Sequence, residues 1–291
     1  MLQGSIVALV TPMTANGDVE WAALDSLIEW HIESGTHGIV PMGTTGESAT
    51  LDTDEHLQVI KRTIQVAAGR VPVIAGTGSN STAEAIHQTQ EAQAAGADAC
   101  LLVTPYYNKP TQAGLVAHYE AIAAATDVPL VLYNVPPRTA CDMQAETVAQ
   151  LSDNPRIIGI KEACGDAGRV GEIRKLVDDA FIILSGEDAQ TLEMLDLGAQ
   201  GAISVTANVC PREMAQFMNL YFGGDRQAAA ELDAKLQPMH DILFVEPNPT
   251  ASKWALHMMG KIGPGIRLPL LPLTEAHHAE LRARLTAIGA L

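Results

Sequence analysis

Short apolar runs alternate with segments of helical pattern along the first 207 residues of the chain. The runs carry hydrophobic side chains at consecutive positions, which is typical of parallel strands that are buried on both faces. The clearest helical segments between them are residues 21–34, 54–68, 83–95 and 115–125. The pattern predicts eight strands, at residues 5–10, 38–43, 71–78, 99–105, 129–136, 157–163, 181–188 and 201–207.

This alternation predicts an α/β fold, a (β/α)8 TIM barrel with a C-terminal helical appendage. Consecutive runs start about 33 residues apart early in the chain and about 20 apart later, the size of one βα unit. Gly-containing turns at residues 34–38, 94–98 and 197–201 suit the C-terminal ends of helices. No GxGxxG motif opens a helix after the first strand, which disfavours an open dinucleotide-binding sheet.

The chain after Pro211 has helical patterns and no strand run. One helix there is needed to complete the eighth βα unit, and we expect the remainder to form a small helical domain. The predicted domains are therefore a barrel at residues 1–223 and a helical domain at residues 224–291, with breaks at residues 246–249 and 263–265. An apolar stripe marks the last helix, at Leu281, Leu285 and Ile288.

Charge and hydropathy exclude several classes of protein. The 291 residues include 18 Lys and Arg against 34 Asp and Glu, a formal net charge of −16, which disfavours binding to nucleic acid. No apolar run reaches the roughly 18 residues that a membrane span needs. The first run lacks a preceding basic region and is ended early by Pro12, so we interpret it as a strand and not as a signal peptide.

The cysteines indicate a reducing compartment, and we expect the protein to be cytoplasmic. They are far apart and form no CxxC pair, which argues against a disulfide framework or a zinc site. The nine histidines show no HExxH-type spacing, so no metal is predicted. The four cysteines are Cys100, Cys141, Cys164 and Cys210.

Lys161 stands at the C-terminal end of an otherwise apolar strand, on the same face as Ile157 and Gly159. Removing an ammonium group from water is costly, so burial favours the neutral amine. A neutral amine can attack a carbonyl carbon and form a Schiff base. The alternative is a lysine whose long stem reaches solvent from the end of the strand. We assign only structural roles to Lys109 and Lys253.

Other predicted strands also end in polar residues, at the edge where this fold carries its catalytic groups. GTTGE at residues 43–47 offers backbone N–H groups and hydroxyls to a carboxylate, or is an ordinary Gly-rich turn. Tyr133 ends the strand before that of Lys161, where a phenol could shuttle the protons of imine chemistry, or it is a core aromatic. Arg138 suits a substrate carboxylate, or a salt bridge between loops.

Three motifs resemble those of a known group of enzymes. GTTGE, YNVPPRT at residues 133–139 and GIKEA at residues 159–163 are similar to the signatures of the pyruvate-dependent class I aldolase superfamily, and within it of the dihydrodipicolinate synthase family. The resemblance covers essentially the whole chain. It implies an aldolase-type lyase without metal or organic cofactor, usually a homotetramer built as a dimer of tight dimers. Such enzymes join pyruvate to L-aspartate 4-semialdehyde, and their product feeds diaminopimelate and lysine biosynthesis.

The resemblance also implies the roles of individual residues. Lys161 forms the Schiff base with pyruvate, the enamine attacks the aldehyde, and the substrate's own amine then displaces Lys161 as a ring closes. Thr44, Tyr107 and Tyr133 form a proton relay in which Tyr107 reaches the site of a neighbouring subunit. The implied binding residues are Thr45 for the pyruvate carboxylate, Arg138 for the carboxylate of the aldehyde substrate, and Gly186 and Ile203 along the pyruvate pocket.

Two alternative activities and one binding function are also considered. N-acetylneuraminate lyases are similar at GTTGE and at the lysine strand but do not typically carry an arginine at the position of Arg138. A 2-keto-3-deoxy sugar acid aldolase is the other enzyme alternative. A non-catalytic barrel that senses a keto acid or amino acid is disfavoured by the joint presence of Lys161, Tyr133, Tyr107 and Thr44.

Feedback inhibition by L-lysine is a further expectation. Similar enzymes that lysine inhibits bind it at the tight-dimer interface. This chain departs from some of them at Thr53, where they place a histidine, which weakens the expected affinity. Glu84 also fits a capping box with Ser81. The matching positions are Ser48, Ala49, His56, Asn80, Glu84 and Tyr106.

Overall fold

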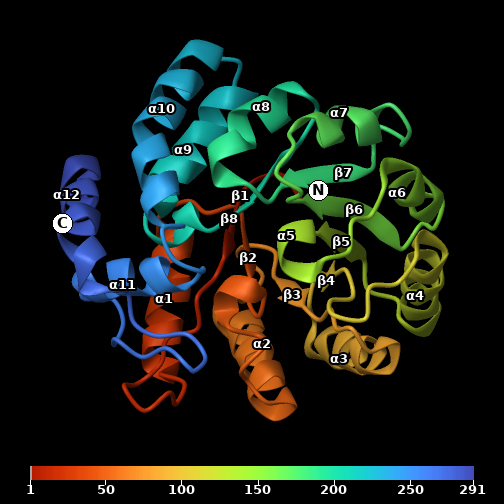
Figure 1. The fold of residues 1–291 in the computed structure, drawn as a ribbon, viewed down its shortest axis with the longest axis horizontal. Coiled ribbons are helices and arrows are strands. Elements are labelled where there is room, and N and C mark those ends of the chain that lie inside the picture. The colour runs from red at the N-terminus through yellow and green to blue at the C-terminus, as the bar shows by residue number, and fades with distance from the viewer. Residues whose placement is uncertain (1) are drawn as a thin grey trace. The chain divides into compact units, whose positions relative to one another are not determined.

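The computed structural model describes residues 2–291, and strands alternate with helices along it as the pattern predicts (Figure 1). All eight predicted strands are present, shortened chiefly at their C-terminal ends, where Gly43 and Pro105 lie in loops and Pro136 begins a short helix. They are β1 (Gly4–Ala8), β2 (Gly38–Val40), β3 (Ile74–Gly76), β4 (Ala99–Val103), β5 (Leu130–Asn134), β6 (Ile157–Glu162), β7 (Ile182–Ser185) and β8 (Gly201–Ser204). They belong to one sheet in the order β2-β1-β8-β7-β6-β5-β4-β3.

The helices follow the strands. The α-helices are α1 (Trp21–Glu33), α2 (Thr53–Ala67), α3 (Thr82–Ala95), α4 (Gln112–Ala125), α5 (Pro136–Thr139), α6 (Ala145–Ser152), α7 (Gly168–Arg174), α8 (Thr191–Asp196), α9 (Pro211–Phe222), α10 (Arg226–Ile242), α11 (Thr250–Met258) and α12 (His278–Ile288). Four short 3-10 helices complete the set: η1 (Thr44–Gly46), η2 (Asp188–Gln190), η3 (Thr206–Asn208) and η4 (Glu275–His277).

Side-chain caps fix where several helices begin. Thr111 accepts a hydrogen bond from the Gly114 backbone (3.2 Å), so α4 begins three residues before the predicted start at residue 115. Ser81 caps α3, but the predicted capping box at this helix is wrong. The Glu84 carboxylate accepts a hydrogen bond from Ser79 Oγ (2.6 Å) instead of reaching back to the cap.

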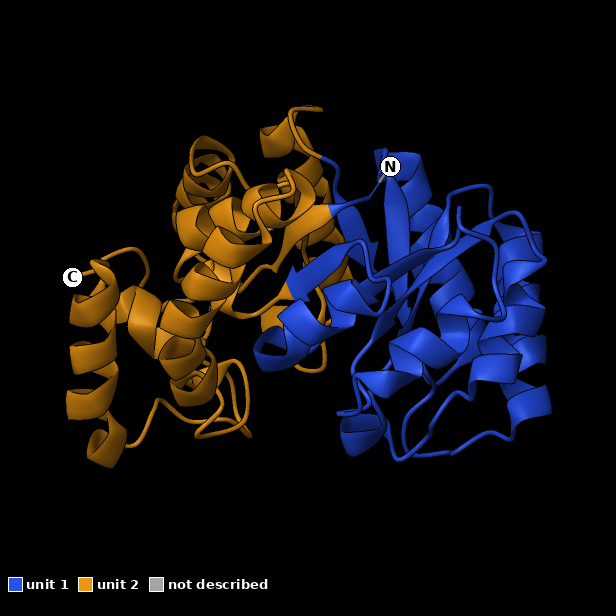
Figure 2. Cartoon of the chain, turned by 90° about the horizontal axis from the view of Figure 1, so that it is seen from above, with its two compact units in different colours: residues 1–3, 72–203 blue, residues 4–71, 204–291 orange. Residues whose placement is uncertain are grey.

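The chain divides into two compact units (Figure 2). Unit 1 comprises Pro72–Ile203 with the start of the chain, and unit 2 comprises Gly4–Val71 and Ser204–Leu291. The part of the chain beyond residue 223 contains α10, α11, η4 and α12 and no strand in the described residues. The domain boundary at residue 223 stays a prediction.

Unit 1 is built on parallel strands that are buried along almost their whole length. Five helices lie outside these strands, and each packs against the next in the order α3, α4, α6, α7 and α8 (Figure 1). In β6, Gly159 lies where a Cβ atom would be 2.4 Å from the carbonyl oxygen of Ile182 in β7. Only glycine therefore allows β6 and β7 to pair at this point without a backbone shift.

Unit 2 pairs β1 with β2 and contains helices from both ends of the chain. The helix α9 packs against β1, α10 packs against α9, and α12 packs against α10 and α11. The predicted stripe on α12 is confirmed at Leu281 and Leu285, which are fully buried, whereas Ile288 is half-buried. Among residues 2–291, no helix is both long enough and apolar enough to cross a membrane.

A buried carboxyl group ties the ends of β5 and β6 together. Glu162 is completely buried, on the face of β6 opposite to Lys161. Asn134 Nδ2 donates to both of its oxygens (3.1 and 3.2 Å), and the Cys164 backbone donates to Oε1 (2.8 Å). Burial raises the pKa of Glu162 to about 7, although these hydrogen bonds and the charge of Arg169 act to lower it.

This buried carboxyl group predicts a pH-dependent component of stability. A carboxyl group whose pKa is higher in the folded state is protonated more readily there, so it stabilises the fold at low pH. That contribution is lost as the pH rises from about 4.5 to about 7. Glu162→Gln keeps the shape and the acceptor oxygen but does not titrate. Relative to this variant, the wild-type free energy of unfolding should fall by up to about 3 kcal/mol across the window, at about 1.4 kcal/mol per pKa unit.

Urea unfolding of both proteins at several pH values between 4 and 8 measures this difference. Parallel pH profiles for the two proteins would contradict the assignment of a raised pKa to Glu162.

Candidate active site

Lys161 and Tyr133 form the centre of the candidate site in unit 1. They are directly paired across β5 and β6, and both side chains are buried. Lys161 Nζ lies 4.3 Å from the centroid of the Tyr133 ring. The predicted neighbourhood of amine and phenol is confirmed, and Lys161 does not reach solvent as the alternative interpretation required.

Gly186 leaves room for the lysine side chain. The Gly186 backbone donates to the Glu162 carbonyl oxygen (2.7 Å), which holds the end of β7 beside β6. A Cβ atom at Gly186 would lie 2.9 Å from Lys161 Cε and 2.7 Å from Ala163 Cβ. A larger residue would therefore displace the amine. Ile203, the other residue predicted to line the pocket, is buried in β8.

Glu187 follows Gly186 directly, and the charges of two predicted site residues act on its carboxyl group. Burial raises the pKa of the Glu187 carboxyl group, and Asp188 acts in the same direction. The positive charges of Lys161 and Arg138 act to lower it. Arg138 itself is exposed in the short helix α5, where its backbone donates to Val135 (2.9 Å). The sequence placed Glu187 at the end of a strand but gave no reason to assign it to the site.

Tyr107 lies in the loop after β4 and is 90% exposed. Its backbone adopts a left-handed conformation with φ of 72°, which is unusual for a residue with a bulky side chain. Within this chain its ring is therefore directed into solvent, and the structure does not place it among the buried residues of unit 1.

Thr44 and Thr45 belong to unit 2, in the 3-10 turn η1 that follows β2. Thr44 is half-buried and Thr45 is 2% exposed. Thr11 Oγ donates to the carbonyl oxygen of Gly46 (2.7 Å), which anchors the turn to the segment after β1. Glu47 ends the turn in a left-handed conformation with φ of 60°.

Residues near the C-terminus hold this turn from the other side, and sequence reasoning did not find them. Asn248 Nδ2 donates to Thr45 Oγ1 (2.8 Å). The Glu47 carboxylate forms a buried ion pair with Lys253 and accepts a hydrogen bond from the Arg267 backbone (2.9 Å). Burial lowers the pKa of Lys253, while the charge of Glu47 acts to raise it. No local pattern indicates these contacts, because Asn248 is 203 positions from Thr45.

The residues predicted to bind lysine fall into two groups. In unit 1, Asn80 Nδ2 donates to the Tyr106 carbonyl oxygen (3.1 Å), while Glu84 is exposed at the start of α3. In unit 2, Ser48 is half-buried, Ala49 is exposed, and His56 is buried in the first turns of α2, the helix that begins at Thr53.

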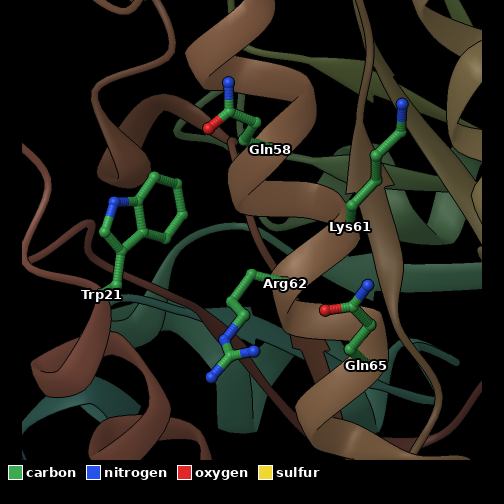
Figure 3. A pocket seen from close by; sticks show the side chains of 5 residues that line it. All are labelled: Trp21, Gln58, Lys61, Arg62 and Gln65. Carbon is green, nitrogen blue, oxygen red and sulfur yellow. The ribbon is translucent and has the colours of Figure 1, made fainter.

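A surface hollow lies elsewhere in unit 2 (Figure 3). It has a volume of about 430 Å³ and contains none of the predicted site residues. Its Arg62 is already paired with Asp25. No group of three or more His, Cys, Asp or Glu residues in the described chain is arranged to hold a metal ion. The lining residues are Trp21, Gln58, Lys61, Arg62 and Gln65.

Comparison with known proteins gives full-length matches. The chain is 54% identical over 291 residues to the 4-hydroxy-tetrahydrodipicolinate synthase of Alcanivorax borkumensis, covering 100% of this chain and 99% of the relative. It is 53% identical to the synthase of Pseudomonas aeruginosa, with both chains covered completely.

Solved structures agree. The structure of the chloride-inhibited dihydrodipicolinate synthase from Acinetobacter baumannii, complexed with pyruvate, matches with a TM-score of 0.98 at 51% identity, covering both chains completely. The synthase from Cyanidioschyzon merolae with lysine bound matches with a TM-score of 0.96 at 39% identity, covering 99% of each chain. The predicted (β/α)8 barrel with C-terminal helices is confirmed. A model of the dihydrodipicolinate synthetase family matches residues 1–288, and the chain belongs to this family.

Proposed function

We infer that this protein is a 4-hydroxy-tetrahydrodipicolinate synthase that condenses pyruvate with L-aspartate 4-semialdehyde. The relatives that match along the whole length of the chain are named for that activity. The observation that carries the chemistry is the buried pair of Lys161 and Tyr133, with Nζ 4.3 Å from the ring centroid. The reaction is an early step of diaminopimelate and lysine biosynthesis.

In the proposed mechanism, Lys161 Nζ attacks the keto carbon of pyruvate and water leaves as the imine forms. Loss of a proton from the methyl group gives an enamine, whose carbon bonds to the aldehyde carbon of the second substrate. The amine of that substrate then attacks the imine carbon, the bond to Lys161 breaks, and a six-membered ring closes. Tyr133, Thr44 and Tyr107 are proposed to carry the protons.

The proposed binding residues follow from charge and space. Arg138 is an exposed guanidinium next to the strand of Tyr133, suited to the carboxylate of the amino aldehyde. Thr45 is proposed to bind the pyruvate carboxylate, and Gly186 and Ile203 to line the pocket. Arg138 also argues against the sugar-acid aldolases, whose substrates have no amino-acid carboxylate to place there.

The proposed assembly is a homotetramer, in which Tyr107 enters the site of a neighbouring subunit. A 90% exposed tyrosine held in a left-handed backbone conformation supports a role outside its own chain. The proposed compartment is the cytoplasm, in keeping with four cysteines that form no disulfide in the described chain.

Borohydride trapping tests the Schiff base. Reduction in the presence of pyruvate should attach one pyruvyl group to the peptide that contains Lys161, because reduction makes the imine permanent. Lys161→Ala should show no adduct and no synthase activity. Lys235→Ala, which removes an exposed lysine of α10, is the matched control and should keep both. Labelling spread over surface lysines, or persisting in Lys161→Ala, would contradict the proposal.

Substitution of Arg138 tests the second substrate. Arg138→Ala should lower kcat/KM for L-aspartate 4-semialdehyde by at least about tenfold, because a hydrogen bond to a charged group contributes about 1.5–3 kcal/mol. Trapping of pyruvate on Lys161 should be unchanged. The control is Arg156→Ala, which removes a half-buried arginine paired with Asp127. Equal activity of the Arg138 variant with this aldehyde would instead favour another aldolase of the superfamily.

We also propose that L-lysine inhibits the enzyme at Ser48, Ala49, His56, Asn80, Glu84 and Tyr106. Support comes from the relative whose structure has lysine bound. The exposed carboxylate of Glu84 and the hydrogen bond between Asn80 and Tyr106 give this surface a charged and a fixed polar component.

Millimolar L-lysine should therefore lower the rate when both substrates are near half-saturation, and D-lysine should have less effect. Glu84→Gln should weaken this inhibition without changing the uninhibited rate, because it removes the charge that attracts a lysine ammonium group. A wild-type rate that L-lysine leaves unchanged would rule out the regulation while leaving the catalytic assignment intact.

A further inference from the structure

The turn that carries Thr45 is held by Asn248, whose side chain makes one hydrogen bond. Asn248 is 5% exposed, and its Nδ2 donates to Thr45 Oγ1 at 2.8 Å. Its Oδ1 is buried and has no hydrogen-bond partner among residues 2–291. Leaving one end of a buried amide unpaired is unfavourable, so the single bond to Thr45 calls for an explanation other than general stability.

The direction of this hydrogen bond decides what the threonine can do. A hydroxyl group has one proton and two lone pairs. Because Thr45 Oγ1 accepts from Asn248, its own proton remains free to be donated. The bond to Asn248 is the one side-chain hydrogen bond of Thr45 in the described chain. The hydroxyl is thus oriented as a donor, which is the form that a substrate carboxylate requires.

The other end of the turn is fixed from the same part of the chain. Glu47, two residues after Thr45, has a fully buried carboxylate that is paired with Lys253 in α11 and bonded to the Arg267 backbone. A buried pair of this kind holds its two elements at a fixed distance, because separating the charges in the interior is costly. The turn is therefore held in place where Asn248 binds Thr45.

We propose that Asn248 is a positioning residue for the keto-acid substrate, acting through Thr45. Its amide fixes the Thr45 side chain and leaves the hydroxyl proton directed toward the substrate carboxylate. The glutamate–lysine pair of Glu47 and Lys253 supports it by immobilising the turn. This inference rests on the proposed function, in which Thr45 binds the pyruvate carboxylate.

Pyruvate affinity is the quantity to measure. The pyruvate concentration that gives half-maximal borohydride trapping on Lys161 should rise by about tenfold in Asn248→Ala and in Thr45→Val, the effect of one charge-assisted hydrogen bond. In steady-state assays, KM for pyruvate should rise by a similar factor, while kcat and KM for L-aspartate 4-semialdehyde stay near the wild-type values. A general loss of structure would not produce this division.

The double variant Asn248→Ala/Thr45→Val separates a route through Thr45 from two independent effects. It should bind pyruvate no more weakly than Thr45→Val alone, because the amide has nothing to orient once the hydroxyl is gone. Ser252→Ala is the matched control, since Ser252 is fully buried in the same segment without contacting the turn through a hydrogen bond. It should leave the affinity for pyruvate unchanged.

Asn248→Asp gives a second test that nearly preserves shape. An ionised carboxylate would accept the Thr45 proton and add a negative charge, so pyruvate affinity should fall further than in Asn248→Ala. Thermal melting of each variant verifies folding, and if Asn248→Ala does not fold, Asn248→Asp and Thr45→Val carry the test.

Unchanged pyruvate affinity in the folded Asn248 variants, or multiplicative losses in the double variant, would overturn this inference while the proposed function stands. A wild-type protein that forms no pyruvyl adduct would overturn the proposed function, and this inference with it.

Discussion

The burial of an amine at the end of a parallel strand is the constraint on which the site depends. Lys161 is 5% exposed, so its Nζ has to be accommodated by the groups beside it and not by bulk water. Tyr133 lies alongside it on β5, and Gly186 provides the space for its stem. One residue earlier or later on β6, the side chain would point to the opposite face of the sheet.

The two faces of β6 carry an amine and a carboxyl group at consecutive positions near the end of the strand. Lys161 faces Tyr133 and the candidate site, whereas Glu162 faces away and is bound by Asn134 and the backbone of Cys164. The second set of contacts joins the ends of β5 and β6, so the strand that presents the amine cannot slide against the strand that presents the phenol. The register of the two candidate catalytic side chains is thus fixed from behind.

Local pattern was sufficient to predict most of the fold. Each of the eight strands is a short run of apolar residues, and a strand buried on both faces needs nothing more to be recognised. The pair of Lys161 and Tyr133 could also be predicted, because consecutive strands with helical crossovers are neighbours in a parallel sheet. The prediction for the start of α3 was right about the cap Ser81 and wrong about Glu84. The Glu84 carboxylate accepts a hydrogen bond from Ser79 Oγ, and the spacing rule for a capping box does not take such a competing donor into account.

Contacts between distant segments could not be predicted in the same way. Nothing around Asn248 or Lys253 indicates Thr45 or Glu47, because the partners are about 200 positions away and the contact depends on the packing of α11. The charge around Glu187 was missed for a related reason. Its surroundings are set by Lys161 and Arg138, which come from two other strand–helix units.

The contacts between the C-terminal segment and the turn after β2 have a consequence for the order in which the protein folds during synthesis. Thr45 is synthesised 203 residues before Asn248, and Glu47 is synthesised 206 residues before Lys253 and 220 residues before Arg267. A growing chain can form its early strands and helices long before this turn is secured. The turn that carries Thr45 is therefore secured late, and a chain that stops before Asn248 lacks all three of these contacts.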